Sequence, residues 1–234
     1  MLTDLELMQI HVRALFTHND ETRLLFVNEP DGGKVCAPRL FLGRTREGNV
    51  WRFRADLPEP LCEELDALCS SEPPDIKFDE PPRNLEALTQ LLEDHAPVQK
   101  VSSGPAYRFT EYPTPTKEIL TVTENEVEIL KNGFEKLVEE LSTWQPFVAL
   151  VEENRVVSVC RSVRITPEAH EAGVETLPEF RGKGYAKEVV TEWARRVQAV
   201  GALPLYSTSW ENSASQAVAR KLKLKCYGAD FQII

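Results

Sequence analysis

The 234-residue sequence contains no apolar run long enough to cross a membrane, which takes about 20 helical residues. The first ten residues already include Asp4 and Glu6, so they lack the charged-then-apolar pattern of a secretory signal peptide. From these absences we expect neither a spanning helix nor a typical leader. We therefore expect a cytoplasmic protein with no membrane partner.

Patterns typical of metal sites and disulfide frameworks are also missing. The five cysteines are odd in number, no pair is spaced as C-x-x-C, and the four histidines form no H-E-x-x-H motif. We expect no metal. Cys160 and Cys226 are conceivable nucleophiles, but the sequence pairs neither with a histidine, and we interpret both as structural.

Positive charge is scarce in this chain. The 27 Lys and Arg residues face 37 Asp and Glu residues, which gives a net charge of −10. Affinity for nucleic acid comes mainly from neutralising phosphates, so we expect no nucleic-acid partner. An acidic surface of this kind tolerates a cationic substrate such as an amine.

A segment rich in proline and glycine, residues 102–116, divides the chain in two. We expect a small N-terminal α+β unit over residues 1–103 and a second domain over residues 104–234. In the first unit, Thr3 and Glu6 have the spacing of a capping box before a helix. The other elements expected there are a hairpin and two short helices, at residues 39–44 with 49–54, at 60–69 and at 83–94.

The second domain has a more regular pattern, in which apolar periodicity switches between helix and strand. Residues 107–109 fit an edge strand. The order that follows is helix, three strands, helix, strand, helix and strand, at residues 124–141, 147–152, 156–165, 171–177, 184–200, 205–210, 213–222 and 226–234. A crossover through the helix at 184–200 predicts that the two strands around it are parallel.

The most informative stretch is residues 174–186, Val-Glu-Thr-Leu-Pro-Glu-Phe-Arg-Gly-Lys-Gly-Tyr-Ala. A strand ends, a proline breaks it, and a turn containing Gly182 and Gly184 opens a long helix. Unpaired N–H groups and the helix dipole at such a turn suit a pyrophosphate, and glycine has no Cβ to hold the anion away. A plain structural turn is the alternative.

Three positive charges accompany this turn, from Arg181, Lys183 and Lys187, with no acid among them. The dinucleotide-binding G-x-G-x-x-G and the nucleotide-binding G-x-x-x-x-G-K-[ST] are both absent. These absences disfavour a dinucleotide or a nucleoside triphosphate as the ligand.

Two motifs here resemble those of the GNAT superfamily of acetyl-CoA-dependent N-acetyltransferases. Residues 181–186, Arg-Gly-Lys-Gly-Tyr-Ala, fit the pyrophosphate motif [RQ]-x-x-G-x-[GA] of that family. Residues 205–215 resemble its next strand and the Asn-x-x-[AS] that opens the following helix. The likeness covers roughly residues 116–234. It implies an α+β fold in which a mixed central sheet is flanked by helices, with the smaller N-terminal α+β unit added.

The resemblance also implies roles for individual residues. The strand containing Val174 and Thr176 would splay from its neighbour and bind the pantetheine arm through its backbone, and Asn212 and Ser215 would approach that arm from the other side. For Asn212, a role as helix N-cap fits equally well. The pyrophosphate would be held by backbone N–H groups of Arg181, Gly182, Lys183, Gly184, Tyr185 and Ala186.

In such enzymes an amine attacks the thioester directly, with a backbone N–H as oxyanion donor and a general base to remove the proton. Candidate bases near the splayed strand are Glu168, His170, Glu171 and Glu175. Alternation places Glu171 and Glu175 on one face and His170 on the other. We prefer Glu171.

The general acid is less defined, because Ala219 stands where the family often has tyrosine and Lys223 where it usually has glycine. Tyr185, Tyr206 and Tyr227 remain candidates, and so does a thiolate protonated by solvent. The function expected is transfer of an acetyl group from acetyl-CoA to a primary amine. The alternative is a non-catalytic acyl-CoA-binding or regulatory module, which the alanine at position 219 supports.

The sequence leaves open the amine acceptor and the role of the N-terminal unit, which either covers the acceptor cleft or makes a homodimer contact. The chain also has one strand after the last helix where the family often has two. We expect a neighbouring element or another subunit to complete the sheet.

Overall fold

The structure, a computed structural model, describes residues 2–74 and 77–234. Elements of the first half are α1 (Asp4–Leu15), β1 (Phe16–His18), β2 (Leu24–Val27), β3 (Leu40–Arg44), β4 (Asn49–Phe53), α2 (Glu59–Ser70), α3 (Leu85–His95) and β5 (Val101–Arg108). Elements of the second half are β6 (Leu120–Thr121), the 3-10 turns η1 (Glu124–Leu130) and η2 (Glu135–Leu137), β7 (Phe147–Glu152), β8 (Arg155–Ile165), β9 (Ala169–Thr176), the 3-10 turn η3 (Pro178–Phe180), α4 (Tyr185–Ala199), β10 (Leu203–Ser207), α5 (Ser213–Lys221) and β11 (Lys225–Ile233).

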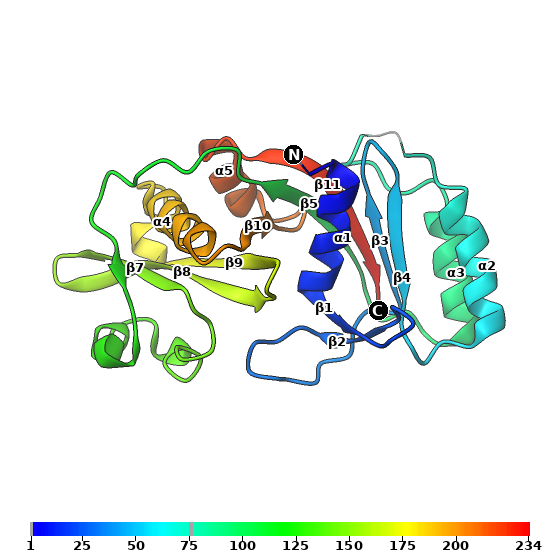
Figure 1. The fold of residues 1–234 in the computed structure, drawn as a ribbon, viewed down its shortest axis with the longest axis horizontal. Coiled ribbons are helices and arrows are strands. Elements are labelled where there is room, and N and C mark those ends of the chain that lie inside the picture. Colours follow the sequence, from blue (N-terminus) through cyan, green and yellow to red (C-terminus); the bar gives the residue numbers. More distant parts are fainter. Residues whose placement is uncertain (1, 75–76) are drawn as a thin grey trace.

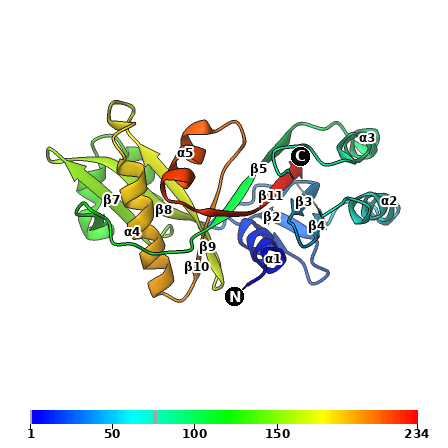
Figure 2. The ribbon, with the colours of Figure 1, turned by 90° about the horizontal axis from the view of Figure 1, so that it is seen from above.

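Within the described residues, nine strands form one mixed sheet in the order β4-β3-β11-β5-β10-β9-β8-β7-β6, and β1 with β2 forms a small separate sheet. Most neighbours are antiparallel, while β9 and β10 are parallel, as the crossover through α4 predicts. This mixed sheet flanked by helices confirms the expected fold class (Figures 1 and 2). No helix among the described residues is long and apolar enough to span a membrane.

The two halves of the chain share this sheet. Strand β11 lies between β3 of the first half and β5, so the N-terminal unit supplies the neighbour that the last strand was expected to need. The boundary expected between residues 103 and 104 falls inside β5. Backbone hydrogen bonds therefore continue across that boundary.

The prediction of an edge strand at residues 107–109 was wrong, because β5 is central and pairs with both β10 and β11. Gly104 and Pro105 suggested a junction, yet both fit the sheet. A Cβ at position 104 would lie 1.6 Å from the Thr208 carbonyl oxygen, so the close approach requires glycine. The Pro105 carbonyl still accepts a bond from the Thr208 N–H at 3.3 Å.

The helix expected over residues 124–141 was also wrong. The capping box of Thr123 and Glu126 forms as predicted, but only η1 and η2 follow it. Gly133, between them, has a φ of +122°, which a continuous helix does not allow. The apolar spacing still places Leu130 and Phe134 in a core against β7 and β8.

Helices cover the sheet in separate patches. Helix α4 packs on β7 to β10, with the fully buried Trp193 at its centre, and the 3-10 turns pack behind β7 and β8. Helices α2 and α3 cover β3 and β4. Helix α1 lies midway along the molecule and contacts β3 and β11 as well as β8 and β9, so it joins both halves (Figure 1).

Candidate functional site

Strands β9 and β10 pair for only three residues and then separate. The register joins Ala169 to Leu203 and ends with Glu171 opposite Leu205. Beyond that point β10 keeps its partner β5, while β9 keeps β8. Among the described residues, 172–176 of β9 therefore have no partner strand on the side of β10, and the two strands form a fork.

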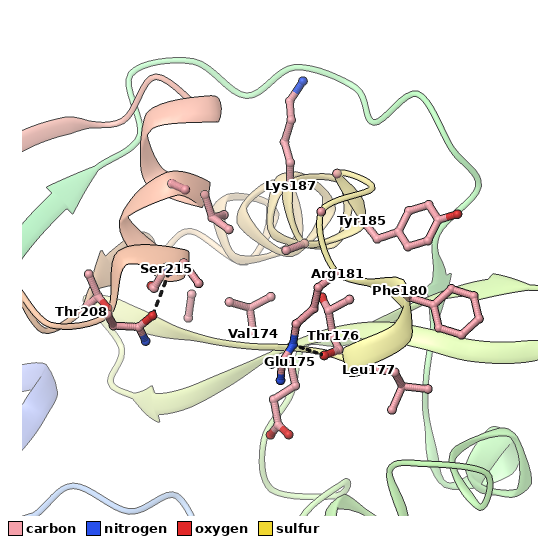
Figure 3. A pocket seen from close by; sticks show the side chains of 18 of the residues that line it. Val174, Glu175, Thr176, Leu177, Phe180, Arg181, Tyr185, Lys187, Thr208 and Ser215 are labelled. Carbon is pink, nitrogen blue, oxygen red and sulfur yellow. Dashed lines mark hydrogen bonds between the residues drawn. The ribbon is translucent and has the colours of Figure 1, made fainter.

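A cavity of about 760 Å³ opens at this fork, within the usual size range of small-molecule sites. Its walls come from both arms of the fork, the turn before α4 and helix α5 (Figure 3). Ten residues were assigned to the cofactor from the sequence, and nine of them line the cavity: Val174, Thr176, Arg181, Gly182, Gly184, Tyr185, Ala186, Asn212 and Ser215. Lys183 instead places its Nζ atom 4.7 Å from the centre of the Phe180 ring.

The turn before α4 presents open backbone to the cavity. Gly182 and Gly184 have φ values of +80° and +89°, and no atom of a described residue lies within 4 Å of a Cβ added to either. In the described part of the chain, no hydrogen-bond acceptor faces the N–H groups of residues 182–186. These donors, at the positive end of the α4 dipole, form a site for an anion.

Positive side chains surround this turn without blocking it. The Nε atom of Arg181 donates to the Thr176 carbonyl oxygen at 3.2 Å, so this side chain folds back over the end of β9. Lys187 and Lys221 also line the cavity, from α4 and α5 (Figure 3 shows Lys187). Lys221 was not assigned to the site from the sequence, because charges near a helix C-terminus have a simpler explanation in the helix dipole.

Asn212 caps helix α5, since its Oδ1 atom accepts from the Ser215 N–H at 3.0 Å. The N-cap role is therefore confirmed, and its amide nitrogen has no hydrogen-bond partner among the described residues. The Tyr206 hydroxyl shares a hydrogen bond of 2.7 Å with the Ser215 hydroxyl. Burial raises the pKa of Tyr206 to about 12, so this phenol stays protonated.

Other lining residues were missed from the sequence. Gly133, Phe134 and Lys136 reach the cavity from the 3-10 turns, and Ser207 and Thr208 from the end of β10. The first group carries no motif and came from a segment expected to be a regular helix. Ser207 and Thr208 line the cavity because they come just after the last β9–β10 pair, where the two strands separate.

Glu171, the base preferred from the sequence, is only 2% exposed and does not line the cavity. Its Oε1 atom lies 2.7 Å from Nδ1 of His11, and its Oε2 atom accepts from the Ser207 hydroxyl at 3.1 Å. The other imidazole nitrogen of His11, Nε2, lies 3.0 Å from Oδ2 of Asp230. Helix α1 and strand β11 thus both contribute to the surroundings of Glu171.

Burial alone lowers the pKa of the fully buried His11, but two carboxylates reverse this effect. The charge of Glu171, with the hydrogen bonds to Asp230 and Glu171, raises the pKa of His11 to about 10. His11 is therefore an imidazolium at neutral pH.

The other candidate bases are divided as alternation predicts. Glu175 shares the face of Glu171, lines the cavity and pairs with Arg161 and Lys136 at 3.0 and 2.9 Å. His170 points to the opposite face, where it bonds Ser162 at 2.9 Å, and burial lowers its pKa.

Three other side chains bear on the chemistry. Ala219 is fully buried, so no side-chain acid reaches the cavity from that position, and Lys223 adopts the φ of +55° that usually favours glycine. Burial raises the pKa of the Cys160 thiol, which disfavours a nucleophilic thiolate.

Of the remaining tyrosines, Tyr185 extends away from the fork in Figure 3, and Lys117 lies 5.3 Å from its ring centre. Tyr227 is fully buried, and its hydroxyl has no hydrogen-bond partner among the described residues. Tyr206 is thus the candidate acid that combines a place in the cavity wall with a hydroxyl bonded to a cofactor-site residue.

Known proteins provide a separate line of comparison. A family model described as GNAT acetyltransferase matches residues 124–228. A search of curated protein sequences finds no match.

Among solved structures, the chain is similar to a GNAT-family acetyltransferase from Colwellia psychrerythraea, with 15% identity over 98% of this chain and 95% of that one and a TM-score of 0.49. It is similar to a GCN5-related N-acetyltransferase-like protein from Streptococcus suis, with 16% identity, 85% of each chain covered and a TM-score of 0.47. It is also similar to a GCN5-related N-acetyltransferase from Kribbella flavida, with 16% identity, 63% of each chain covered and a TM-score of 0.46. The chain spans less than two thirds of the length of some structures that it matches.

The matched residues contain the β9–β10 fork, the turn before α4 and the capped start of α5. The residues that form the fork, the turn and the cap thus lie within the range that resembles a GNAT acetyltransferase domain.

Proposed function

We propose that the fork cavity binds acetyl-CoA and that the protein transfers the acetyl group to a primary amine by direct attack. The observation that carries this proposal is the union of two features in one cavity. One is the row of unpaired N–H groups at residues 182–186, and the other is the unpartnered edge of β9. The first suits a pyrophosphate and the second an extended, amide-containing arm.

The residues present fit the chemistry of that ligand. Backbone N–H groups at Gly182 and Gly184 would hold the pyrophosphate, with Lys187 and Lys221 adding positive charge. The β9 backbone at Val174 and Thr176 would bond the amides of the pantetheine arm, as an added strand would. Asn212 keeps its amide nitrogen for the opposite side of the arm.

The reacting atoms would meet in the fork, where β9 backbone N–H groups can stabilise an oxyanion. Glu171 is the proposed base, and its burial means that it acts through a group that does reach the cavity. Tyr206 is the proposed proton donor to the departing thiolate, since its pKa of about 12 keeps the proton available.

A second function remains a candidate on one observation. Ala219 leaves the position of the frequent family acid without a functional group, and this residue does not line the cavity. A module that binds acyl-CoA without transferring the acyl group would tolerate this loss.

Calorimetric titration with CoA, followed by thiol release from acetyl-CoA, separates these functions. We expect saturable CoA binding and release of thiol with at least one member of a panel of amines, amino acids, polyamines and peptides. Binding without release across the panel would favour the module. Absence of CoA binding would contradict both functions.

A further inference from the structure

Ser207 connects the fork cavity to a buried group of charges. It is the last residue of β10 and lies on the same strand face as Leu205, the partner of Glu171 at the closed end of the fork. The residue lines the cavity, and its hydroxyl donates to Glu171 Oε2 at 3.1 Å. One hydroxyl therefore touches both the cavity and a carboxylate that the cavity does not reach.

Behind Ser207 the hydrogen bonds continue through three further elements. Glu171 in β9 contacts His11 in α1, and His11 contacts Asp230 in β11. The side chains of His11, Glu171 and Asp230 are 0, 3 and 9% exposed. We call these three residues, with Ser207, the relay.

The protonation state of the relay follows from its geometry. Each imidazole nitrogen of His11 faces a carboxylate oxygen, which accepts hydrogen bonds only, so both nitrogens carry a proton. One imidazolium between two carboxylates leaves a net charge of −1. This charge is buried beside the Ser207 hydroxyl and has the capacity to take up one proton.

We propose that Ser207 is a catalytic residue that takes the proton of the acceptor ammonium and passes its own proton to Glu171, which His11 and Asp230 position. This inference rests on the proposed acetyl transfer. It gives the N-terminal half a part in the reaction, because helix α1 supplies His11.

Two proton transfers accompany the attack of the amine on the thioester. The ammonium nitrogen gives one proton to Ser207 Oγ as the Ser207 hydroxyl proton moves to Glu171 Oε2, which becomes neutral. The freed lone pair forms the C–N bond to the acetyl carbon, the C–S bond breaks, and its electron pair leaves with sulfur. Tyr206 gives its hydroxyl proton to that thiolate and takes up the second nitrogen proton. Glu171 returns its proton through Ser207 to solvent when the products leave.

The competing bases are less suited to this step. Glu175 lines the cavity, but Arg161 and Lys136 neutralise its charge, and removing a proton from an ammonium would leave both cations uncompensated. Glu168 pairs with Arg13 at an exposed site. His170 faces the α4 side.

The first test is Ser207→Ala, a change at a partly exposed position that leaves the buried charges in place. With the best amine of the panel, we expect kcat to fall at least about 100-fold, the lower end of general-base effects, with CoA affinity within about twofold of wild type. The rate of the variant should rise about tenfold per pH unit up to the pKa of the amine, because the solvent must now remove the proton. The rate of wild type should reach its plateau at a lower pH than that of the variant.

Ser207→Thr keeps the hydroxyl and should recover most of the lost rate. Tyr227→Phe is a matched control, because its ring lies 6.2 Å from that of His11 while its hydroxyl has no hydrogen-bond partner among the described residues. It should retain wild-type kcat and pH profile. His11→Gln removes the imidazole that positions Glu171 and should lower kcat as Ser207→Ala does.

The outcomes separate the relay from the proposed function. An active wild type with an equally active Ser207→Ala variant and an unchanged pH profile would overturn the relay alone. CoA binding with no turnover of any amine by wild type would overturn both the relay and the transfer. Loss of rate in the alanine variant without recovery in the threonine variant would reduce Ser207 to a packing role.

Discussion

At the scale of single residues, Gly184 and Gly201 share a backbone conformation and differ in what they face. Their φ values are +89° and +86°, and in the part of the chain that the structure describes an added Cβ meets no atom within 4 Å at either position. Gly184 lines the cavity, whereas Gly201 follows the end of α4 on its far side. Comparing the same substitution at the two glycines therefore distinguishes the effect of backbone strain from an effect on ligand binding.

Gly184→Ala and Gly201→Ala should each lower the free energy of unfolding by about 1 kcal/mol, because alanine is strained at positive φ. Only Gly184→Ala should weaken CoA binding, by about tenfold or more, since its methyl group would stand before the N–H donors. Urea unfolding and calorimetric titration measure the two effects. Equal CoA affinity in the two variants would contradict the anion site at this turn.

His11 makes a second prediction, on stability. Its folded pKa of about 10 lies above the unfolded value of 6.5, so its contribution is fully present below pH 6.5 and is lost as pH rises toward 10. Between about pH 7 and about pH 8, the free energy of unfolding should fall by about 1 kcal/mol. His18 and His170 have lowered pKa values and titrate below this window.

Urea denaturation across this pH window measures that slope. His11→Gln should be less stable at pH 7, because it leaves two buried carboxylates without a cation between them. Its free energy of unfolding should also depend less on pH. An equal slope in the variant would refute an imidazolium at position 11.

At the scale of elements, β5 and β10 approach unusually closely where they border the fork. A Cβ on Gly104 would lie 1.6 Å from the backbone oxygen of Thr208, a residue that lines the cavity. Because the Thr208 oxygen belongs to the backbone, the two segments must separate to admit a side chain at position 104.

Gly104→Ala should therefore lower the free energy of unfolding by about 1–3 kcal/mol and also weaken CoA binding, since it displaces one wall of the fork. Gly33→Ala is a milder control, because the three described atoms nearest to its Cβ are side-chain atoms of Asp31 and Glu29 at 3.2 Å or more. Thermal unfolding with and without CoA measures both effects. A Gly104→Ala protein as stable as the Gly33→Ala protein would contradict the close packing of Gly104 against the Thr208 backbone.

Patterns among neighbouring residues in the sequence predicted most of these elements. They failed where contacts between residues far apart in the sequence determine the structure. The turn at Gly182 and Gly184 and the capped start of α5 at Asn212 follow from neighbouring residues alone. The central place of β5 does not, because its partners come from positions near 206 and 229. The relay could not be predicted from the sequence either, because His11 and Asp230 lie far from Glu171 along the chain and match no motif.

At the scale of the whole molecule, the shared sheet and helix α1 connect the two halves of the chain. Strand β11 bridges β3 and β5, and the ion pair of Arg13 with Glu168 joins α1 to the start of β9. We therefore predict that both halves open in one cooperative step. Hydrogen exchange should give peptides of β3 and β8 the same opening free energy. A value several kcal/mol lower for β3 would indicate independent halves.

The central claim is that the fork cavity directs acetyl transfer to an amine, and its most direct test follows the acetyl group itself. Wild type is incubated with acetyl-CoA carrying a 13C-labelled acetyl group and with the amine panel, and products are identified by mass spectrometry. We predict label on the nitrogen of an acceptor, in equal amount to the thiol released, and loss of this product in Gly184→Ala but not in Gly201→Ala. Tight CoA binding with no labelled amide from any amine would contradict the claim.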